Sequence, residues 1–251
     1  RITEMGLLRL TTNPAVAALP SHLRLKGSLF DIKTTGTSPE QVFLSAVIPS
    51  QSDPVNLDLY AWDGAAWSPL GNPSAEVACL AVMPNGDLVA GGAFAAVGSV
   101  AIPNLARWDG SVWSAFPAGP IGTVAALRLL PNGDLLVGRG TSIDRWNGAG
   151  WVTLGAVTGG AVRALLDLPN GEIVAAGSLQ QIGNAAASNL AQWNGSAWQP
   201  LGAGSNGTVH SLMRLPSGQL LAGGMFTVAG TVRIDGLGVW NGTAWGPLGA
   251  G

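Results

Sequence analysis

Polar residues stand at two positions of a repeated strand where the other copies are apolar. When the copies are aligned by the proline that follows each strand, the first position reads Ala78, Ala125, Arg163 and His210, and the second reads Val82, Leu129, Asp167 and Arg214. Residues four apart in a strand share a face, so the two polar residues of each strand are expected side by side. Basic and polar side chains gathered in this way could bind a small anionic or sugar ligand.

The same residues also have a purely structural interpretation, which we favour from the sequence. Asp167 facing Arg214 across neighbouring strands would form a partly buried ion pair, an arrangement that perturbs pKa values without catalysing a reaction. The alternative is a ligand held by Arg163, His210 and Arg214, with Asp167 beside them. The sequence leaves both interpretations open.

A third candidate position lies where one repeat is shorter than the others. Between Pro131 and Trp146 there are nine residues fewer than in the corresponding interval of the other repeats, and the shortening falls in a loop. The resulting notch would expose Arg139, Asp144 and Arg145, which are predicted to bind a ligand. The alternative is that the short loop is neutral drift.

The sequence contains few residues suited to catalysis. A glycosidase needs two carboxylates as acid and base, and only Asp31 and Asp167 fall on strands predicted to be innermost, so such an enzyme is kept as an alternative function. The two histidines, His22 and His210, and the single cysteine, Cys79, favour neither a metal site nor a cysteine nucleophile. We therefore assign no catalytic residue, and we expect no metal and no cofactor.

The elements that carry these residues are internal repeats. All ten tryptophans lie in pairs spaced as W-x-G-x-x-W, and a Pro-Asn-Gly or Pro-Ser-Gly motif recurs in phase with them. The steps between the first tryptophans are 46, 38, 47 and 47 residues. The pairs begin at Trp62 (WDGAAW), Trp108 (WDGSVW), Trp146 (WNGAGW), Trp193 (WNGSAW) and Trp240 (WNGTAW).

Each repeat is predicted to form four short strands. In the fourth repeat these are VRALLDL, EIVAAG, NLAQW and AWQPL, with turns at Pro-Asn-Gly and at Asn-Gly between them. Asp63 and Asp109 replace the asparagine of WNGSAW in two repeats, so the recurring requirement is a turn and not a glycosylation sequon. Asn194, Asn206 and Asn241 would be glycosylated only if a eukaryotic secretory pathway made the chain. The tryptophan pairs are interpreted as core and not as sugar platforms.

Tandem four-stranded units of about 45 residues predict an all-β chain, a five-bladed β-propeller of four-stranded antiparallel blades. The blades are expected at about 27–71, 72–118, 119–156, 157–203 and 204–251, with residues 1–26 as an N-terminal cap or extra strand. An alternative makes residues 1–55 a small separate β-domain.

The repeats also resemble a known family. A strand ending in Gly-Gly, a variable loop, a strand ending in Trp-Asp/Asn-Gly, and then Trp and PLG are similar to kelch-type propeller repeats. LAGGMFTVAG followed by WNGTAWGPLGAG resembles the repeats of secreted bacterial propellers and of fungal cortical-marker surface proteins. The resemblance covers residues 77–251 and implies adhesion, surface organisation or protein interaction.

The amino-acid composition limits the classes of partner that we expect. Charged residues make up only 10% of the chain, with 12 Lys and Arg against 14 Asp and Glu, so a nucleic-acid partner is not expected. No apolar run reaches the length of a membrane helix, and no membrane insertion is expected. A polar surface with two lysines is typical of an extracellular or cell-surface protein.

Together these observations predict a non-enzymatic binding or scaffold module at the cell surface or outside the cell. Its partner is expected to be a protein or a glycan, and self-association is a further expectation. A carbohydrate-binding propeller is the first alternative and a glycosidase-like enzyme is the second.

Overall fold

The computed structural model describes residues 29–34, 42–48, 56–63, 65–119 and 122–249, with side chains from Leu59 onward. The cap predicted at residues 1–26 and the side chain of Asp31 therefore lie outside the described part. All regular elements in the described ranges are strands, and none of these ranges holds a helix that could cross a membrane. The chain forms two compact units, Arg1–Val124 and Ala125–Gly251.

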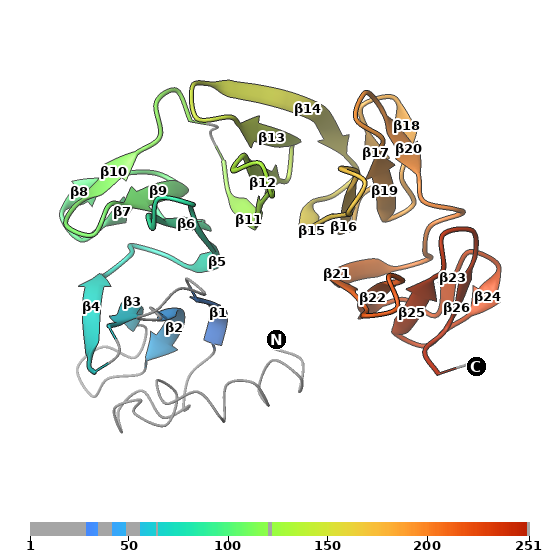
Figure 1. The fold of residues 1–251 in the computed structure, drawn as a ribbon, viewed down its shortest axis with the longest axis horizontal. Coiled ribbons are helices and arrows are strands. Elements are labelled where there is room, and N and C mark those ends of the chain that lie inside the picture. Colours follow the sequence, from blue (N-terminus) through green and yellow to red (C-terminus); the bar gives the residue numbers. More distant parts are fainter. Residues whose placement is uncertain (1–28, 35–41, 49–55, 64, 120–121, 250–251) are drawn as a thin grey trace. The chain divides into compact units, whose positions relative to one another are not determined.

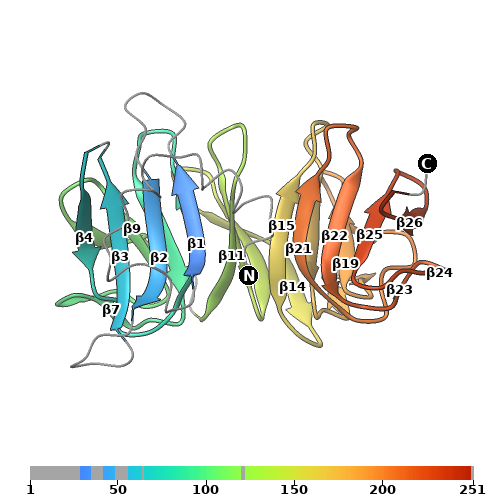
Figure 2. The ribbon, with the colours of Figure 1, turned by 90° about the horizontal axis from the view of Figure 1, so that it is seen from below.

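The first unit contains two repeats, each an antiparallel sheet of four strands (Figures 1 and 2). The first repeat is β1 (Leu29–Thr34), β2 (Val42–Ile48), β3 (Asn56–Trp62) and β4 (Trp67–Gly71), paired in that order. The second is β5 (Val77–Val82), β6 (Leu88–Gly92), β9 (Leu105–Trp108) and β10 (Trp113–Ala115). A small hairpin, β7 (Ala96–Val97) and β8 (Val100–Ala101), fills the loop between β6 and β9. We call such an insertion a loop hairpin.

The second unit carries three further repeats. The third repeat is β11 (Val124–Leu129), β12 (Leu135–Arg139), β13 (Ser142–Trp146) and β14 (Trp151–Thr158). The fourth is β15 (Val162–Asp167), β16 (Ile173–Gly177), β19 (Leu190–Trp193) and β20 (Trp198–Pro200). The fifth is β21 (Thr208–Arg214), β22 (Leu220–Met225), β25 (Leu237–Trp240) and β26 (Trp245–Pro247). Their loop hairpins are β17 (Gln181–Ile182) with β18 (Ala185–Ala186), and β23 (Val228–Ala229) with β24 (Val232–Arg233). The predicted all-β class with antiparallel four-stranded sheets is confirmed.

The W-x-G-x-x-W motif is a four-residue turn closed by a tryptophan pair. In the fourth repeat Trp193 is the register partner of Trp198. The Asn194 side-chain oxygen accepts hydrogen bonds from the backbone N–H groups of Ser196, at 3.0 Å, and Ala197, at 2.9 Å. Asp109 makes the same two bonds in the second repeat. Asparagine and aspartate both carry the required acceptor, which explains why they exchange at this position.

In the second, fourth and fifth repeats a glycine near the end of the second strand, Gly92, Gly177 or Gly224, fits a β-bulge on the first strand. In the fourth repeat the register shifts between Val162 and Ala164, so Arg163 is the extra residue of the bulge. A Cβ atom at Gly177, opposite the bulge, would lie 1.9 Å from the carbonyl oxygen of Ala161. Glycine is therefore required there because the bulged backbone leaves no room for a side chain.

The prediction that the tryptophan pairs form core is confirmed in part. Four tryptophans are buried and three more pack partly buried against the core: Trp62, Trp113, Trp198 and Trp245, and then Trp108, Trp193 and Trp240. The two rings of each pair lie 5.3–5.7 Å apart, centroid to centroid. The second ring packs on the Leu-Gly of the preceding repeat: the indole N–H of Trp198 donates to the Leu154 carbonyl at 3.1 Å, and that of Trp113 donates to Leu70 at 2.7 Å. Aromatic burial of this kind links consecutive repeats within each unit.

Loop hairpins make a second link between consecutive repeats. In the first unit Pro73, just after β4, forms a bridge with Val97 of β7. In the second unit β14 is eight residues long and pairs with β17 through Val157 and Ile182, which joins six strands in one sheet. Val157 and Thr158 favour this extension because β-branched residues suit strands. The third repeat itself has only Gly140 and Thr141 between β12 and β13, so it contains no loop hairpin.

Candidate functional site

The bulged positions of β15 and β21 bring two basic residues together. Arg163 and His210 are the extra residues of equivalent bulges, and both are exposed. Partial burial, followed by the positive charge of Arg163, lowers the pKa of His210 below its usual 6.5. The strands β15 and β21 are neighbours, and the charge of Arg163 acts on the imidazole of His210.

The bulge also changes which residues share a face. Arg163 and Asp167 were expected side by side because they are four residues apart, but the bulge at Arg163 breaks the two-residue alternation on which this expectation rests. Arg214 lies at the other end of β21 from His210, in the register position opposite Leu220. The four residues predicted to cluster therefore do not lie at one place along the strands.

The ion pair predicted between Asp167 and Arg214 is wrong. The Asp167 carboxylate accepts a hydrogen bond and forms an ion pair with Arg128, which comes from β11 of the preceding repeat. Asp167 is 16% exposed and Arg128 is 40% exposed, so the pair is partly buried. Arg128 was missed because the alignment singled out the column one residue further along β11, at Leu129. Within the described residues, Arg214 has no carboxylate within 4.0 Å.

Replacing Arg163 with glutamine is expected to raise the pKa of His210 toward 6.5, because the nearby positive charge that disfavours the imidazolium is removed. The measurement is an NMR titration of the imidazole signals, assigned in a His22→Gln background. Arg233→Gln, on an exposed hairpin, is the control that leaves the pKa unchanged. An unaltered titration in Arg163→Gln would contradict the proximity of the two groups.

The lowered pKa of His210 makes the stability of the folded chain depend on pH. The unfolded chain has the higher histidine pKa, so it binds more protons than the folded chain as the pH falls through about 6.5. The contribution of His210 to stability is therefore full above pH 6.5 and declines below it, until the pH passes the lowered folded pKa.

The notch of the third repeat holds a closed polar network. Asp144 is 4% exposed and accepts hydrogen bonds from Arg139 at 2.7 Å, Thr153 at 2.7 Å and Ser142 at 2.6 Å. The Arg139 side chain is only 12% exposed. These contacts occupy both carboxylate oxygens of Asp144, so the arrangement is that of a structural ion pair in place of the missing loop.

Arg145, the third residue predicted for the notch, belongs to another contact. Its Nε lies 3.7 Å from a carboxylate oxygen of Asp134 in the turn between β11 and β12. Arg145 and Asp144 are consecutive in β13 and so point to opposite faces of the sheet. The structure thus brings together Arg139 and Asp144, and places Arg145 elsewhere.

A pocket that the sequence did not reveal lies between the fourth and fifth repeats. Its volume is about 400 Å³. Glu172, Gln192 and Gln219 supply polar groups, and Trp240 supplies an aromatic ring. Glu172 follows the Pro169-Asn170-Gly171 turn directly in the sequence. A comparison of the third strands could have revealed this pocket, because Gln192 stands where the second and third repeats have Arg107 and Arg145.

The described residues contain no group of three or more His, Cys, Asp or Glu side chains that could hold a metal ion. Cys79 is buried, and its sulfur lies 3.6 Å from the Gly91 carbonyl oxygen.

Solved structures share this arrangement of strands. One is described as YCF48 bound to D1 peptide, with a TM-score of 0.51 and 18% identity over 88% of this chain and 66% of that chain. The extracellular domain of a protein described as a hybrid two component system of B. thetaiotaomicron gives 0.58 and 10% identity, over 86% of this chain and 28% of the other. PorZ, described as a surface component of the type-IX secretion system of Porphyromonas gingivalis, gives 0.54 and 11% over 86% and 33%.

These structures are β-propellers. The fold of this chain is a β-propeller. No protein family matched the sequence, and no curated protein did. The chain spans less than two thirds of the length of each of the three propellers, and at these identities the likeness concerns the fold alone. The repeats are accordingly blades, while the kelch-like character stays a prediction.

Proposed function

We propose that this propeller is a non-enzymatic binding module, extracellular or at the cell surface, whose partner is a protein. The observation that carries the proposal is the pair of exposed basic residues on neighbouring blades, Arg163 and His210. An acidic group of a partner would lie between them and gain charge-assisted hydrogen bonds. Asp167 does not cancel these charges, because its own carboxylate is paired with Arg128.

The similar propellers give this proposal its setting. One of them is described as bound to a peptide, one as an extracellular domain and one as a surface component. Propellers host many functions, so these descriptions support a protein partner and a surface location without assigning either. Use of Asn194, Asn206 and Asn241 as glycosylation sites remains a prediction.

The test is a pair of screens with the same purified chain, one against an array of acidic peptides and one against a glycan array. We expect binding to carboxylate-rich peptides that weakens about tenfold or more in Arg163→Ala, because a hydrogen bond to a charged group is lost. Arg214→Ala, at the far end of β21, measures whether the site extends along the strand.

Other outcomes of these screens would favour one of the alternative functions. Binding to glycans alone would replace the protein partner with a carbohydrate, and turnover of a glycoside that is abolished in Asp167→Asn would make the chain an enzyme. Blank arrays together with a defined oligomer in light scattering would favour a self-associating scaffold.

A further inference from the structure

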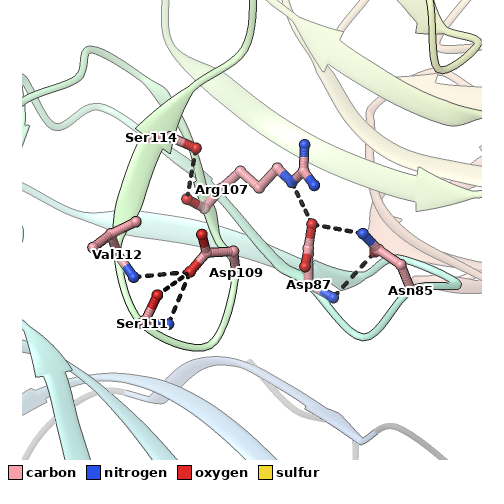
Figure 3. Close-up of polar contacts among 7 residues, drawn as sticks. All are labelled: Asn85, Asp87, Arg107, Asp109, Ser111, Val112 and Ser114. Atoms are coloured by element: carbon pink, nitrogen blue, oxygen red, sulfur yellow. Dashed lines mark hydrogen bonds and ion pairs between the residues drawn. The ribbon is translucent and has the colours of Figure 1, made fainter.

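The pocket between the fourth and fifth blades is lined by Gln192, at a register position where the second and third blades carry an arginine. In the second blade, Asp87 in the turn after β5 accepts hydrogen bonds from the Asn85 amide, at 2.9 Å, and from the Arg107 guanidinium (Figure 3). Arg107 comes from β9 and stands opposite Val89 in the register. The turn carboxylate of this blade is thus neutralised from within the chain.

The third blade repeats this arrangement. Asp134 accepts a hydrogen bond from the Asn132 amide at 2.9 Å, and the Nε of Arg145 lies 3.7 Å from the same carboxylate oxygen. Arg145 is opposite Leu136 in the register, as Arg107 is opposite Val89. Two blades therefore show that a guanidinium group is the natural companion of this carboxylate.

The fourth blade keeps the carboxylate and loses the arginine. Glu172 accepts hydrogen bonds from the side-chain amides of Asn170, at 2.6 Å, and Gln192. Gln192 stands opposite Val174, at the register position where the second and third blades carry arginine. Both bonds end on Oε2, so Oε1 is left without a bond among the described residues. The amide of Gln192 carries no charge, so the carboxylate of Glu172 is not neutralised by it.

The surroundings of Glu172 suit a planar cation. The pocket of about 400 Å³ opens beside it, and the half-buried ring of Trp240 lines the same space. Guanidinium groups stack on tryptophan faces and bond to carboxylates, and the two contacts together are stronger where water is partly excluded. Gln219 adds a neutral amide to the lining of the same pocket.

We propose that this pocket binds the guanidinium group of an arginine side chain presented by a protein partner, with Glu172 as the carboxylate and Trp240 as the aromatic wall. The partner's arginine would supply the charge that Arg107 and Arg145 supply in their own blades. The inference rests on the proposed function only in taking the partner to be a protein, and it concerns a site apart from Arg163 and His210.

The experiment titrates the purified chain with capped arginine, Nα-acetyl-arginine methylamide, and follows the indole N–H signals by NMR. Capped citrulline, a neutral molecule of the same shape, is the matched probe. We expect the Trp240 signal, assigned with Trp240→Phe, to move with arginine, and the association constant to be at least about tenfold smaller for citrulline. An arginine-containing peptide, tested beside the capped amino acid, separates a peptide source from free guanidinium compounds.

Three variants locate the contact. Glu172→Gln removes the charge and is expected to lower the association constant about tenfold or more. Gln192→Arg gives the blade the chain's own guanidinium, as in the second and third blades, and is expected to abolish binding although the carboxylate remains. Asp235→Asn removes an exposed acid of the same unit and is expected to leave binding unchanged.

Equal binding of arginine and citrulline, or full binding by Gln192→Arg, would overturn the inference. A Trp240 signal that moves with hexoses and not with capped arginine would also overturn it and would assign the pocket to sugars. Arg163→Ala is expected to retain arginine binding. This variant therefore distinguishes a failure of the acidic-peptide site from a failure of the arginine pocket.

Discussion

Replacing Asp144 with alanine is expected to lower the free energy of unfolding by about 3–5 kcal/mol. The change leaves the guanidinium of Arg139, whose side chain is only 12% exposed, without its carboxylate. The hydroxyl groups of Ser142 and Thr153 lose their acceptor at the same time. Urea denaturation followed by circular dichroism measures the effect.

A double variant separates the ion pair from packing. Arg139→Met combined with Asp144→Leu replaces both charges with apolar groups and is expected to recover most of the loss, because no buried charge is left unpaired. Asp235→Asn, from an exposed pair with Arg233, is expected to change stability little. A cost below about 1 kcal/mol for Asp144→Ala would show that the network is not structural, and would reopen the notch as a ligand site.

Replacing Trp198 with alanine is expected to cost about 3–5 kcal/mol, the range for large aromatic residues deleted from a core. The ring is 7% exposed, pairs with Trp193, and rests on the Leu154-Gly155 segment of the preceding blade. Denaturation by urea, read by circular dichroism, again provides the measurement. A cost of less than about 1 kcal/mol would mean that the tryptophan pairs do not hold consecutive blades together.

Phenylalanine substitutions isolate the indole hydrogen bond. In the native chain the indole N–H of Trp198 donates to the Leu154 carbonyl at 3.1 Å. Trp198→Phe removes this donor and leaves the carbonyl without it. The equivalent N–H of Trp245 is buried and has no acceptor among the described residues. Trp198→Phe is therefore expected to cost about 1 kcal/mol more than Trp245→Phe. Equal costs for the two variants would contradict a stabilising role for this bond.

The fold could be read from the sequence because its signals are local and repeated. Turn chemistry at Asn194-Gly195 and at Pro169-Asn170-Gly171 fixed the strand boundaries, and the repetition of the tryptophan pairs confirmed each boundary several times. A single occurrence of either motif would have predicted a hairpin and nothing more.

The candidate sites were harder to predict because they depend on register between blades. The bulge at Arg163 is not visible in a pattern of alternating residues, and it changed the face of Arg163 relative to Asp167. The partner of Asp167 came from β11, one residue away from the aligned column. Glu172 was hidden for another reason: the second and third blades carry a carboxylate at the same position of the turn, and the absence of an arginine at Gln192 distinguishes the fourth blade from them.

The long strand β14 has a mechanical consequence. Through Val157 and Ile182 it continues the sheet of the third blade into the loop hairpin of the fourth, whereas Pro73 meets Val97 in a single bridge in the first unit. Under a pulling force, the third and fourth blades cannot separate until the ladder between β14 and β17 has been sheared. This pair of blades is therefore expected to yield as one mechanical element.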